Sequence, residues 1–381
     1  MKWEELEPQL IELRKELHKY PELSGKESQT AKRIIEFAKR FNPDEIISKV
    51  GGEGVLVIFE GEQKGKTILI RCDLDALPID EENAFEHKSV YENISHKCGH
   101  DGHMSIVSGL IPILSENKIK KGKVVLLFQP AEETGQGASL VLSDAKFTKL
   151  KPDFAFALHN LPGFEKNQII IKKDVFASAS KGLIIRLKGK TSHAGEPERG
   201  ITPSLAVAEL IQEITALPKN KIIQDFSLVT IIHSRIGERA FGTTPGYAEL
   251  MATLRSYKDE DINKLTDLSE QLINRIAADH KLKYEIEWVE EFPSTKNDND
   301  CVEIISQCAE ENNLRINEID KPFRWSEDFG HFTHNYKGAL FGLGSGINQP
   351  QLHNPDYDFP DEIISTGTKM FYSIIKKVLE S

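Results

Sequence analysis

Short apolar runs that alternate with helical patterns constrain the fold of this chain more than any other feature. The runs are bounded by glycine, proline or charged residues, as is typical of buried strands. They occupy residues 55–59, 67–70, 123–128 and 154–158. Helical patterns lie before and between them, at residues 3–17, 30–41 and 102–115. This β-α-β order predicts an α/β domain. Within the first helical pattern, Pro8 predicts that the regular helix begins near Glu7.

The pattern changes near Ala177 and resumes after a polar break at residues 293–298. Between these points, strand patterns at 183–187, 226–232, 248–254 and 284–289 accompany helical patterns at 203–217 and 259–280. A chain of 381 residues is long enough for two domains. We therefore expect an inserted α+β domain, residues 177–290, within an α/β domain made of residues 1–176 and 291–381.

The charge and cysteine content restrict the classes of partner. A formal net charge of -11 repels phosphate backbones and argues against nucleic-acid binding. The N-terminal residues are acidic, and no segment approaches the roughly 20 apolar residues of a membrane span, so no membrane partner is expected. The four cysteines are too few and too scattered for a disulfide framework. Together these features predict a cytoplasmic protein.

A first cluster of reactive side chains is Cys98-Gly99-His100-Asp101. Gly99 favours a turn, in which a thiolate and an imidazole can converge on one point. Asp101 stands where the N-cap of the following helix is expected. Taken alone, the pattern also fits a buried cysteine beside a surface histidine.

A second cluster is the pair Glu132 and Glu133, which follows the apolar run at 123–128. The carboxyl ends of strands are where α/β folds carry their active sites. A bound cation would keep one carboxylate ionised while the other serves as a base. A solvated acidic loop is the alternative reading.

Three further segments offer side chains of the same kind. His159 lies at the end of the run at 154–158, and His353 lies in a loop before the last helical pattern. Asp73 and Asp75 follow the run at 67–70 and would point the same way on a continued strand, where they could orient metal ligands or a water. Each segment alone also fits an ordinary strand end, turn or loop.

Taken together, the segments supply five side chains of metal-ligand type: Cys98, His100, Glu133, His159 and His353. Five ligands and a bridging water are too many for one tetrahedral zinc ion but suit two adjacent ions. The sequence therefore predicts a centre for two divalent metal ions.

An ordered series of motifs extends over nearly the whole chain. It comprises Leu17-His18-Lys19-Tyr20-Pro21-Glu22 with Glu27, Asp73-Leu74-Asp75-Ala76-Leu77-Pro78, Cys98-Gly99-His100-Asp101, Gln129-Pro130-Ala131-Glu132-Glu133, His159, and Ser326-Glu327-Asp328-Phe329. The series resembles the aminoacylase and carboxypeptidase-G-like metallopeptidase family. It is most similar to the amidohydrolase branch, which includes hippurate hydrolase, N-acetyldiaminopimelate deacetylase and auxin-conjugate hydrolases.

The resemblance implies a metal-dependent enzyme that cleaves the amide bond of small N-acyl amino acids. It implies that the five side chains above hold two ions. A thiolate and imidazoles favour zinc and availability can favour manganese, with cobalt or nickel as alternatives. Glu132 would be the general base and Asp73 the acid that orients the metal site. A dipeptidase or carboxypeptidase of the same family, and a non-catalytic module that retains the fold, are the alternatives.

The resemblance also implies a parallel-rich catalytic domain with an inserted lid domain of the dimerisation type. Exposed edge strands of the lid favour a symmetric homodimer formed through it. Within the lid, His193 is similar to a histidine that reaches the substrate carbonyl, and Arg255 to an arginine that holds the substrate carboxylate. One departure stands out. The branch has Ala-x-Asn-Val-Ile-Pro where this chain has Ala240-Phe241-Gly242-Thr243-Thr244-Pro245, so Gly242 replaces the asparagine.

Overall fold

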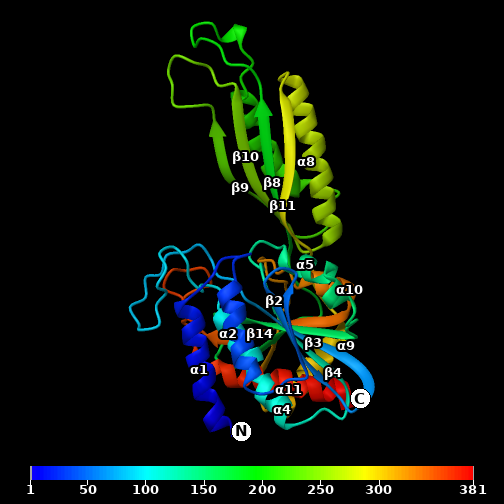
Figure 1. Cartoon of the computed structure of the whole chain (residues 1–381). Helices are drawn as coiled ribbons and strands as arrows, with labels where there is room; N and C mark the ends of the chain where they lie inside the picture. Colours follow the sequence, from blue (N-terminus) through cyan, green and yellow to red (C-terminus); the bar gives the residue numbers. More distant parts are fainter. Residues whose placement is uncertain (1, 381) are drawn as a thin grey trace. The chain divides into compact units, whose positions relative to one another are not determined.

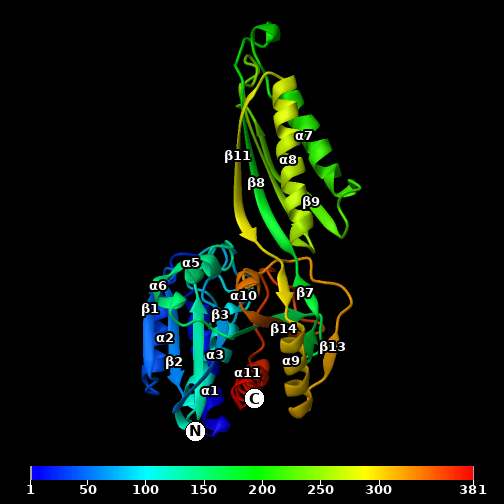
Figure 2. The ribbon, with the colours of Figure 1, turned by 90° about the vertical axis from the view of Figure 1, so that its right-hand side faces the viewer.

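A computed structural model describes residues 2–380, which form two compact units. The second unit comprises Ala177–Ser294 and Pro322–Glu327, and the rest of the chain forms the first (Figures 1 and 2). The predicted insertion, residues 177–290, lies within the second unit, which also takes in residues 291–294 and 322–327. The last of these segments joins the second unit through backbone hydrogen bonds from Ser178 to Phe323 and Trp325.

The first unit is built on an eight-stranded sheet. In spatial order its strands are β1 (Glu45–Val50), β2 (Gly54–Glu60), β4 (Lys121–Gln129), β3 (Gln63–Asp73), β5 (Phe154–Pro162), β14 (Lys337–Gly346), β6 (Ile169–Ile171) and β13 (Ile316–Glu318). The central strands β4, β3, β5 and β14 are mutually parallel, whereas β1–β2, β2–β4 and β14–β6 are antiparallel. Two short strands, β7 (Asp174–Ala177) and β12 (Thr295–Asn297), pair separately. The predicted parallel-rich α/β domain is confirmed.

Helices cover both faces of this sheet, which explains why its strands read as continuous apolar runs. One face packs against α1 (Trp3–Lys19), α2 (Ser28–Lys39), α3 (His100–Ser108), α4 (Leu110–Glu116), α9 (Asn299–Glu311) and α11 (Ile364–Glu380) in a single apolar core. The other is covered by α5 (Gly137–Ser143), α6 (Ala145–Thr148) and α10 (Gly330–Asn335), where the rings of Phe147 and Phe332 are in contact. Within residues 2–380, no helix is both long enough and apolar enough to span a membrane.

Helix α1 begins earlier than its sequence predicts. It starts at Trp3 and contains Pro8, so the predicted start near Glu7 is wrong. Pro8 is the sixth residue of α1, so it removes the hydrogen bond that a backbone N–H at this position would donate to the Glu4 carbonyl. Leu6 and Leu10 on the same face are fully buried and hold the first turns in place.

The second unit is an antiparallel sheet with helices on one face. Its strands, in spatial order, are β11 (Lys283–Phe292), β8 (Ala179–Lys188), β10 (Tyr247–Ser256) and β9 (Ser227–Ile236). Helices α7 (Ser204–Ala216) and α8 (Asp259–Asp279) pack on alternate residues of β10, whose other residues are less buried. This alternation is typical of a sheet with one covered face. The predicted α+β composition is confirmed.

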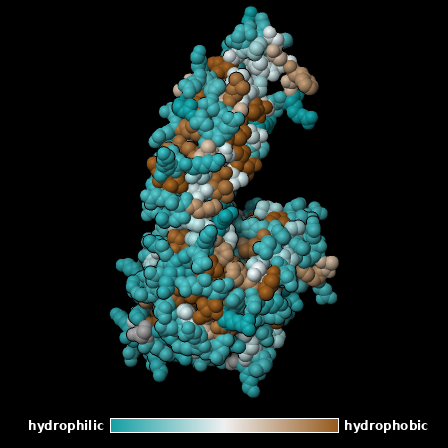
Figure 3. Space-filling model, turned by 180° about the vertical axis from the view of Figure 1, so that it is seen from behind, coloured by the Kyte–Doolittle hydropathy of each residue, from teal (hydrophilic) through white to brown (hydrophobic). Residues whose placement is uncertain are grey.

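Strand β9 is an edge strand of this sheet and carries exposed apolar side chains. Leu228, Ile232 and Ile236 are each at least 39% exposed. Figure 3 shows apolar side chains reaching the surface of this unit among hydrophilic ones. An edge strand with unpaired backbone groups and apolar side chains is a surface on which another chain can pair.

Candidate metal centre

The carboxyl ends of the four parallel strands bring distant segments to one edge of the first sheet. Asp73 ends β3 and is paired in register with Gln129 at the end of β4. His159 lies near the end of β5, the next parallel strand along the sheet. The loop that follows β4 carries Glu132 and Glu133. Parallel pairing alone therefore gathers the side chains that the sequence scatters over 60 positions and more.

The turn at Gly99 places the remaining part of the cluster. Gly99 adopts a left-handed conformation, with φ of 93°, and is itself the N-cap of α3. The prediction that Asp101 caps this helix is wrong, because Asp101 lies within the first helical turn. Its buried carboxylate instead accepts hydrogen bonds from His18 at 2.9 Å and Arg14 at 3.3 Å, both from α1. These bonds fix the start of α3 to α1.

The five predicted ligands lie together in the first unit. Cys98, His100 and His159 present donor atoms that are all within 4.8 Å of one another, and so do Cys98, Glu133 and His353. The Cys98 Sγ atom is 3.5 Å from His159 Nε2. Glu133 Oε1 is 3.8 Å from His100 Nε2 and 3.9 Å from His353 Nε2. These two sets of three possible ligands share Cys98, so two neighbouring ions could be bound here.

Both buried imidazoles use Nδ1 for a backbone carbonyl and turn Nε2 toward the cluster. His100 Nδ1 donates to the backbone carbonyl of Asp75 at 2.8 Å, and His159 Nδ1 donates to that of Asn160 at 2.9 Å. A carbonyl only accepts, so in the neutral rings the proton is on Nδ1 and the lone pair on Nε2. This is the orientation of a metal-ligating histidine.

Several buried atoms of the cluster lack a partner within the chain. Glu133 Oε1, Asp75 Oδ1 and His100 Nε2 make no hydrogen bond to any atom of residues 2–380. Buried polar atoms without partners are costly and rare in proteins. A divalent cation would satisfy an oxygen and an imidazole nitrogen at once, and the thiolate, imidazole and carboxylate donors suit zinc and related ions. The residues therefore fit a metal centre.

The electrostatics of the cluster also favour bound positive charge. Burial, together with the Glu133 carboxylate, raises the pKa of Cys98 well above its ordinary value. Burial raises the pKa of Glu133 to about 8. Burial alone would lower the pKa of His100, but Asp73 and Cys98 raise it well above its usual range. All three groups hold protons tightly, so metal ions would bind by displacing them.

Asp73 is held as an anion beneath the cluster. Burial would raise its pKa, but His100, His103 and Arg71 keep it well below its ordinary value. Arg71 Nη1 donates to one carboxylate oxygen at 2.8 Å, and His103 Nδ1 lies 2.8 Å from the other. His103 was not among the predicted site residues, although its position three residues after His100 places both on one side of a helix.

His353 is held in a strained backbone conformation. Its φ is 67°, which is unusual for a residue with a side chain and costs on the order of 1–3 kcal/mol. Its backbone N–H donates to the Lys97 carbonyl at 2.8 Å, directly beside Cys98. The side chain is half-exposed, unlike the other imidazoles of the cluster. Strain of this kind indicates that the surrounding structure holds the backbone of His353 in place.

His193 and Arg255 belong to the second unit. His193 forms an isolated bridge with Thr243. Arg255 Nη1 donates to Ser326 Oγ at 2.9 Å and to the Arg324 carbonyl at 3.2 Å. Burial lowers the pKa of the half-buried Arg255 guanidinium, and the Glu290 carboxylate opposes this effect.

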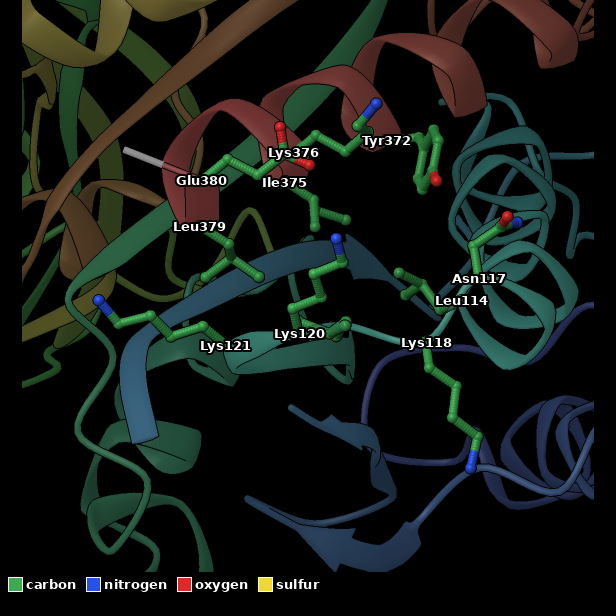
Figure 4. Close-up of a pocket in the computed structure, with 11 residues that line it drawn as sticks. Leu114, Asn117, Lys118, Lys120, Lys121, Tyr372, Ile375, Lys376, Leu379 and Glu380 are labelled. Carbon is green, nitrogen blue, oxygen red and sulfur yellow. The ribbon is translucent and has the colours of Figure 1, made fainter. Parts of the chain in front are cut away.

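A cavity of about 340 Å³ lies apart from these residues, between the ends of α4 and α11 (Figure 4). Apolar side chains such as Leu114, Ile375 and Leu379 line it together with lysines, including Lys120 and Lys376. None of the predicted site residues contributes to its wall. The cavity is therefore separate from the metal centre.

Comparison with known protein families shows which family the chain belongs to. The model of peptidase family M20/M25/M40 matches residues 69–377. The chain belongs to this family. It is therefore a hydrolase of carbon–nitrogen bonds in linear amides, as the resemblance of its motifs predicted.

Curated relatives match over almost their full length. An N-acetyl-L-cysteine deacetylase of Bacillus subtilis is 29% identical over 99% of this chain and 89% of its own length. A hippurate hydrolase of Campylobacter jejuni is 29% identical over 99% of this chain and 98% of its own. A crystal structure of a Bacillus subtilis M20 peptidase, described as dinuclear metal binding, superposes with a TM-score of 0.84 at 25% identity, and the match covers 100% of both chains.

The metal assignment predicts a specific loss in a cysteine variant. Cys98→Ala removes a donor that both groups share, so we expect bound metal to fall and affinity to drop by at least about 10- to 100-fold. Cys308→Ala is the matched control, because Cys308 is buried in α9. Metal content after dialysis against a chelator measures the difference. Equal metal retention by the two variants would contradict the assignment.

Proposed function

We propose that this protein hydrolyses the amide bond of small N-acyl amino acids to give a carboxylic acid and a free amino acid. The observation that carries the proposal is the meeting of Glu132 and Glu133 with Cys98 and two buried imidazoles at one sheet edge. The relatives named as a deacetylase and a hippurate hydrolase support this substrate class.

We assign the binding of two divalent ions to the first unit, which would be the catalytic domain. The proposed ligands are Cys98, His100, Glu133, His159 and His353. Zinc or manganese is the expected metal, with cobalt or nickel as alternatives. Bound ions of this kind acidify a shared water and polarise a carbonyl oxygen.

Glu132 is the proposed general base. Its side chain is 5% exposed, and its Oε2 lies 3.9 Å from His100 Nε2. A carboxylate in this position takes a proton from the attacking water and delivers it to the nitrogen of the leaving amine. Asp73 would orient the metal site, because Arg71 and His103 fix the positions of its two carboxylate oxygens.

We propose that the second unit is a lid domain that contributes two substrate contacts. His193 would donate to the oxyanion that forms at the acyl carbonyl, a contact typically worth about 3 kcal/mol of barrier. Arg255 would bind the substrate carboxylate through paired hydrogen bonds. Its guanidinium is partly desolvated and donates to two neutral oxygens, with Glu290 as the carboxylate that acts on its charge, and an anionic ligand would add to this compensation.

We further propose a homodimer through the lid. The exposed edge strand β9 supports this, because two copies could pair their free backbone groups there.

The scattered cysteines favour a reducing compartment. Cell fractionation would test the predicted cytoplasmic location.

Replacing the base should stop the reaction without emptying the site. We expect Glu132→Gln to lower kcat by on the order of 10²- to 10⁴-fold, with metal content unchanged. The assay uses a panel of acetyl-, benzoyl- and indole-acyl amino acids alongside dipeptides, and Glu62→Gln on the surface is the control. Turnover that survives in the variant would refute the base assignment. If the wild type prefers dipeptides, a peptidase is favoured. If it hydrolyses none of the substrates, a non-catalytic binding module is favoured.

Replacing the arginine should affect only substrates that carry a carboxylate. We expect Arg255→Ala to raise KM by about 10- to 100-fold for an N-acyl amino acid, since a charge-assisted hydrogen bond is lost. The same variant should hydrolyse an N-acyl amine without a carboxylate as the wild type does. Steady-state kinetics on the two substrates measure the difference. An equal change for both would exclude a carboxylate contact.

A charge on the edge strand should dissociate the dimer. Ile232 in β9 is 58% exposed, and we expect Ile232→Lys to sediment as a monomer at concentrations where the wild type is a dimer. Val90→Lys, at an exposed apolar position of the first unit, is the control and should remain dimeric. A monomeric wild type, or a dimer unaffected by Ile232→Lys, would rule out this interface.

A further inference from the structure

The loop that carries Glu132 and Glu133 depends on an unfavourable backbone conformation. Ala131 has a φ of 51°, in the left-handed region that residues with a side chain rarely adopt. Such a conformation persists only where neighbouring groups impose it. Because Ala131 immediately precedes Glu132, any relaxation of this residue would redirect the side chain of the proposed base.

Side chains from outside the loop bind the backbone on both sides of Glu132. The Ala131 N–H donates to Glu27 Oε1 at 2.8 Å. The Glu133 N–H donates to Asp75 Oδ2 at 3.0 Å. The Ala131 carbonyl accepts from the Gly137 N–H at 3.0 Å, which closes the loop on itself. The unusual backbone at Ala131 is thus held from both its amide and its carbonyl side.

Glu27 comes from a short segment that also reaches Asp75. Ser24 Oγ donates to Asp75 Oδ2 at 2.7 Å, and Leu23 bridges to Ala76 in parallel fashion. The carboxylate of Glu27 is fully buried, and its Oε1 also accepts from the Gly25 N–H at 2.8 Å. Residues 23–27 therefore connect the segment after β3 to the loop after β4.

The carboxylate of Glu27 does not cap α2, although Glu27 stands at the N-terminus of that helix. Glu27 is the N-cap residue of α2, yet its side chain makes no capping hydrogen bond. Glu22 serves the helix instead, since its Oε2 accepts from the backbone N–H groups of Gln29 and Thr30. Burial raises the pKa of Glu27 to about 7, so keeping a carboxyl group there is costly. The buried carboxylate therefore stabilises the loop that carries Glu132 and not α2.

We propose that Glu27 is a positioning residue for the hydrolytic reaction, which holds Ala131 in its left-handed conformation and thereby directs Glu132 toward the cluster. The proposal rests on the proposed role of Glu132 as base. Glu27 touches neither substrate nor the reacting atoms. It acts through the backbone of the loop.

Three variants test this proposal in the full-length, metal-loaded protein. Glu27→Ala removes the acceptor for Ala131, Glu27→Gln retains an oxygen acceptor, and Glu22→Ala weakens α2 without touching the loop. We expect Glu27→Ala to lower kcat by on the order of 10- to 100-fold with little change in KM, as for a misplaced catalytic group. Glu27→Gln should recover most of kcat, and Glu22→Ala should lose thermal stability but retain kcat.

Amide hydrogen exchange gives a readout that does not need turnover. Peptides covering residues 129–135 should exchange on the order of tenfold faster in Glu27→Ala than in the wild type, and no faster in Glu22→Ala. Unchanged exchange and kcat in Glu27→Ala would overturn the proposal. The proposal would also be overturned if Glu27→Ala and Glu22→Ala, at the same loss of melting temperature, lost the same amount of kcat and of exchange protection. If the wild type hydrolyses no N-acyl amino acid, the proposed function fails while the exchange result still decides whether Glu27 holds the loop.

Discussion

Buried carboxylates need compensating positive charge, and the first unit depends on how that charge is distributed. An unpaired buried carboxylate is strongly unfavourable. Beneath the cluster, Arg71 bonds to both Asp73 and Asp328, and Arg14 and His18 bond to Asp101. These carboxylates are neutralised by cations that the chain supplies. They form a rigid layer on which the strand ends and the start of α3 are fixed.

At the cluster itself the compensation is incomplete. Glu133 and Asp75 each have a buried oxygen without a hydrogen bond, as Asp101 has, but unlike Asp101 they have no arginine beside them in the described part of the chain. No arginine or lysine among residues 2–380 forms an ion pair with either group. The two buried arginines are thus bonded to Asp73, Asp328 and Asp101, whereas Glu133 and Asp75 face the imidazole of His100. Under the proposed function, metal ions bound at the cluster would supply the positive charge that Glu133 and Asp75 lack.

The sequence predicted those features that follow from strand order. Asp73, Glu133 and His159 could be placed at one edge because parallel strands end on the same side of a sheet, whatever lies between them in the chain. The turn at Gly99 could also be predicted, since a left-handed turn favours glycine. In each case a local pattern and one topological rule suffice.

Features that depend on contacts between distant side chains could not be predicted. Asp101 looked like a helix cap, but its partners, Arg14 and His18, lie more than 80 positions away. Glu27 belonged to a recognised motif, yet its bond to Ala131 spans 104 positions and has no local signature. The segment at residues 322–327 joins the second unit through backbone bonds to Ser178 that no periodicity encodes. Tertiary hydrogen bonding decided all three.

The departure at Gly242 is best understood from the way His193 is held. Backbone groups make the link: the Ala194 N–H donates to the Gly242 carbonyl at 3.0 Å, and the Thr244 N–H donates to the Ser192 carbonyl at 2.9 Å. Neither bond needs a side chain at position 242, where an added Cβ would meet no atom within 4 Å. The loss of asparagine therefore leaves the support of His193 intact. It removes one polar side chain beside Phe241, which is itself fully exposed, while Thr243 and Thr244 place hydroxyl groups where the family pattern has Val and Ile, so the polar groups of this loop are shifted along the chain.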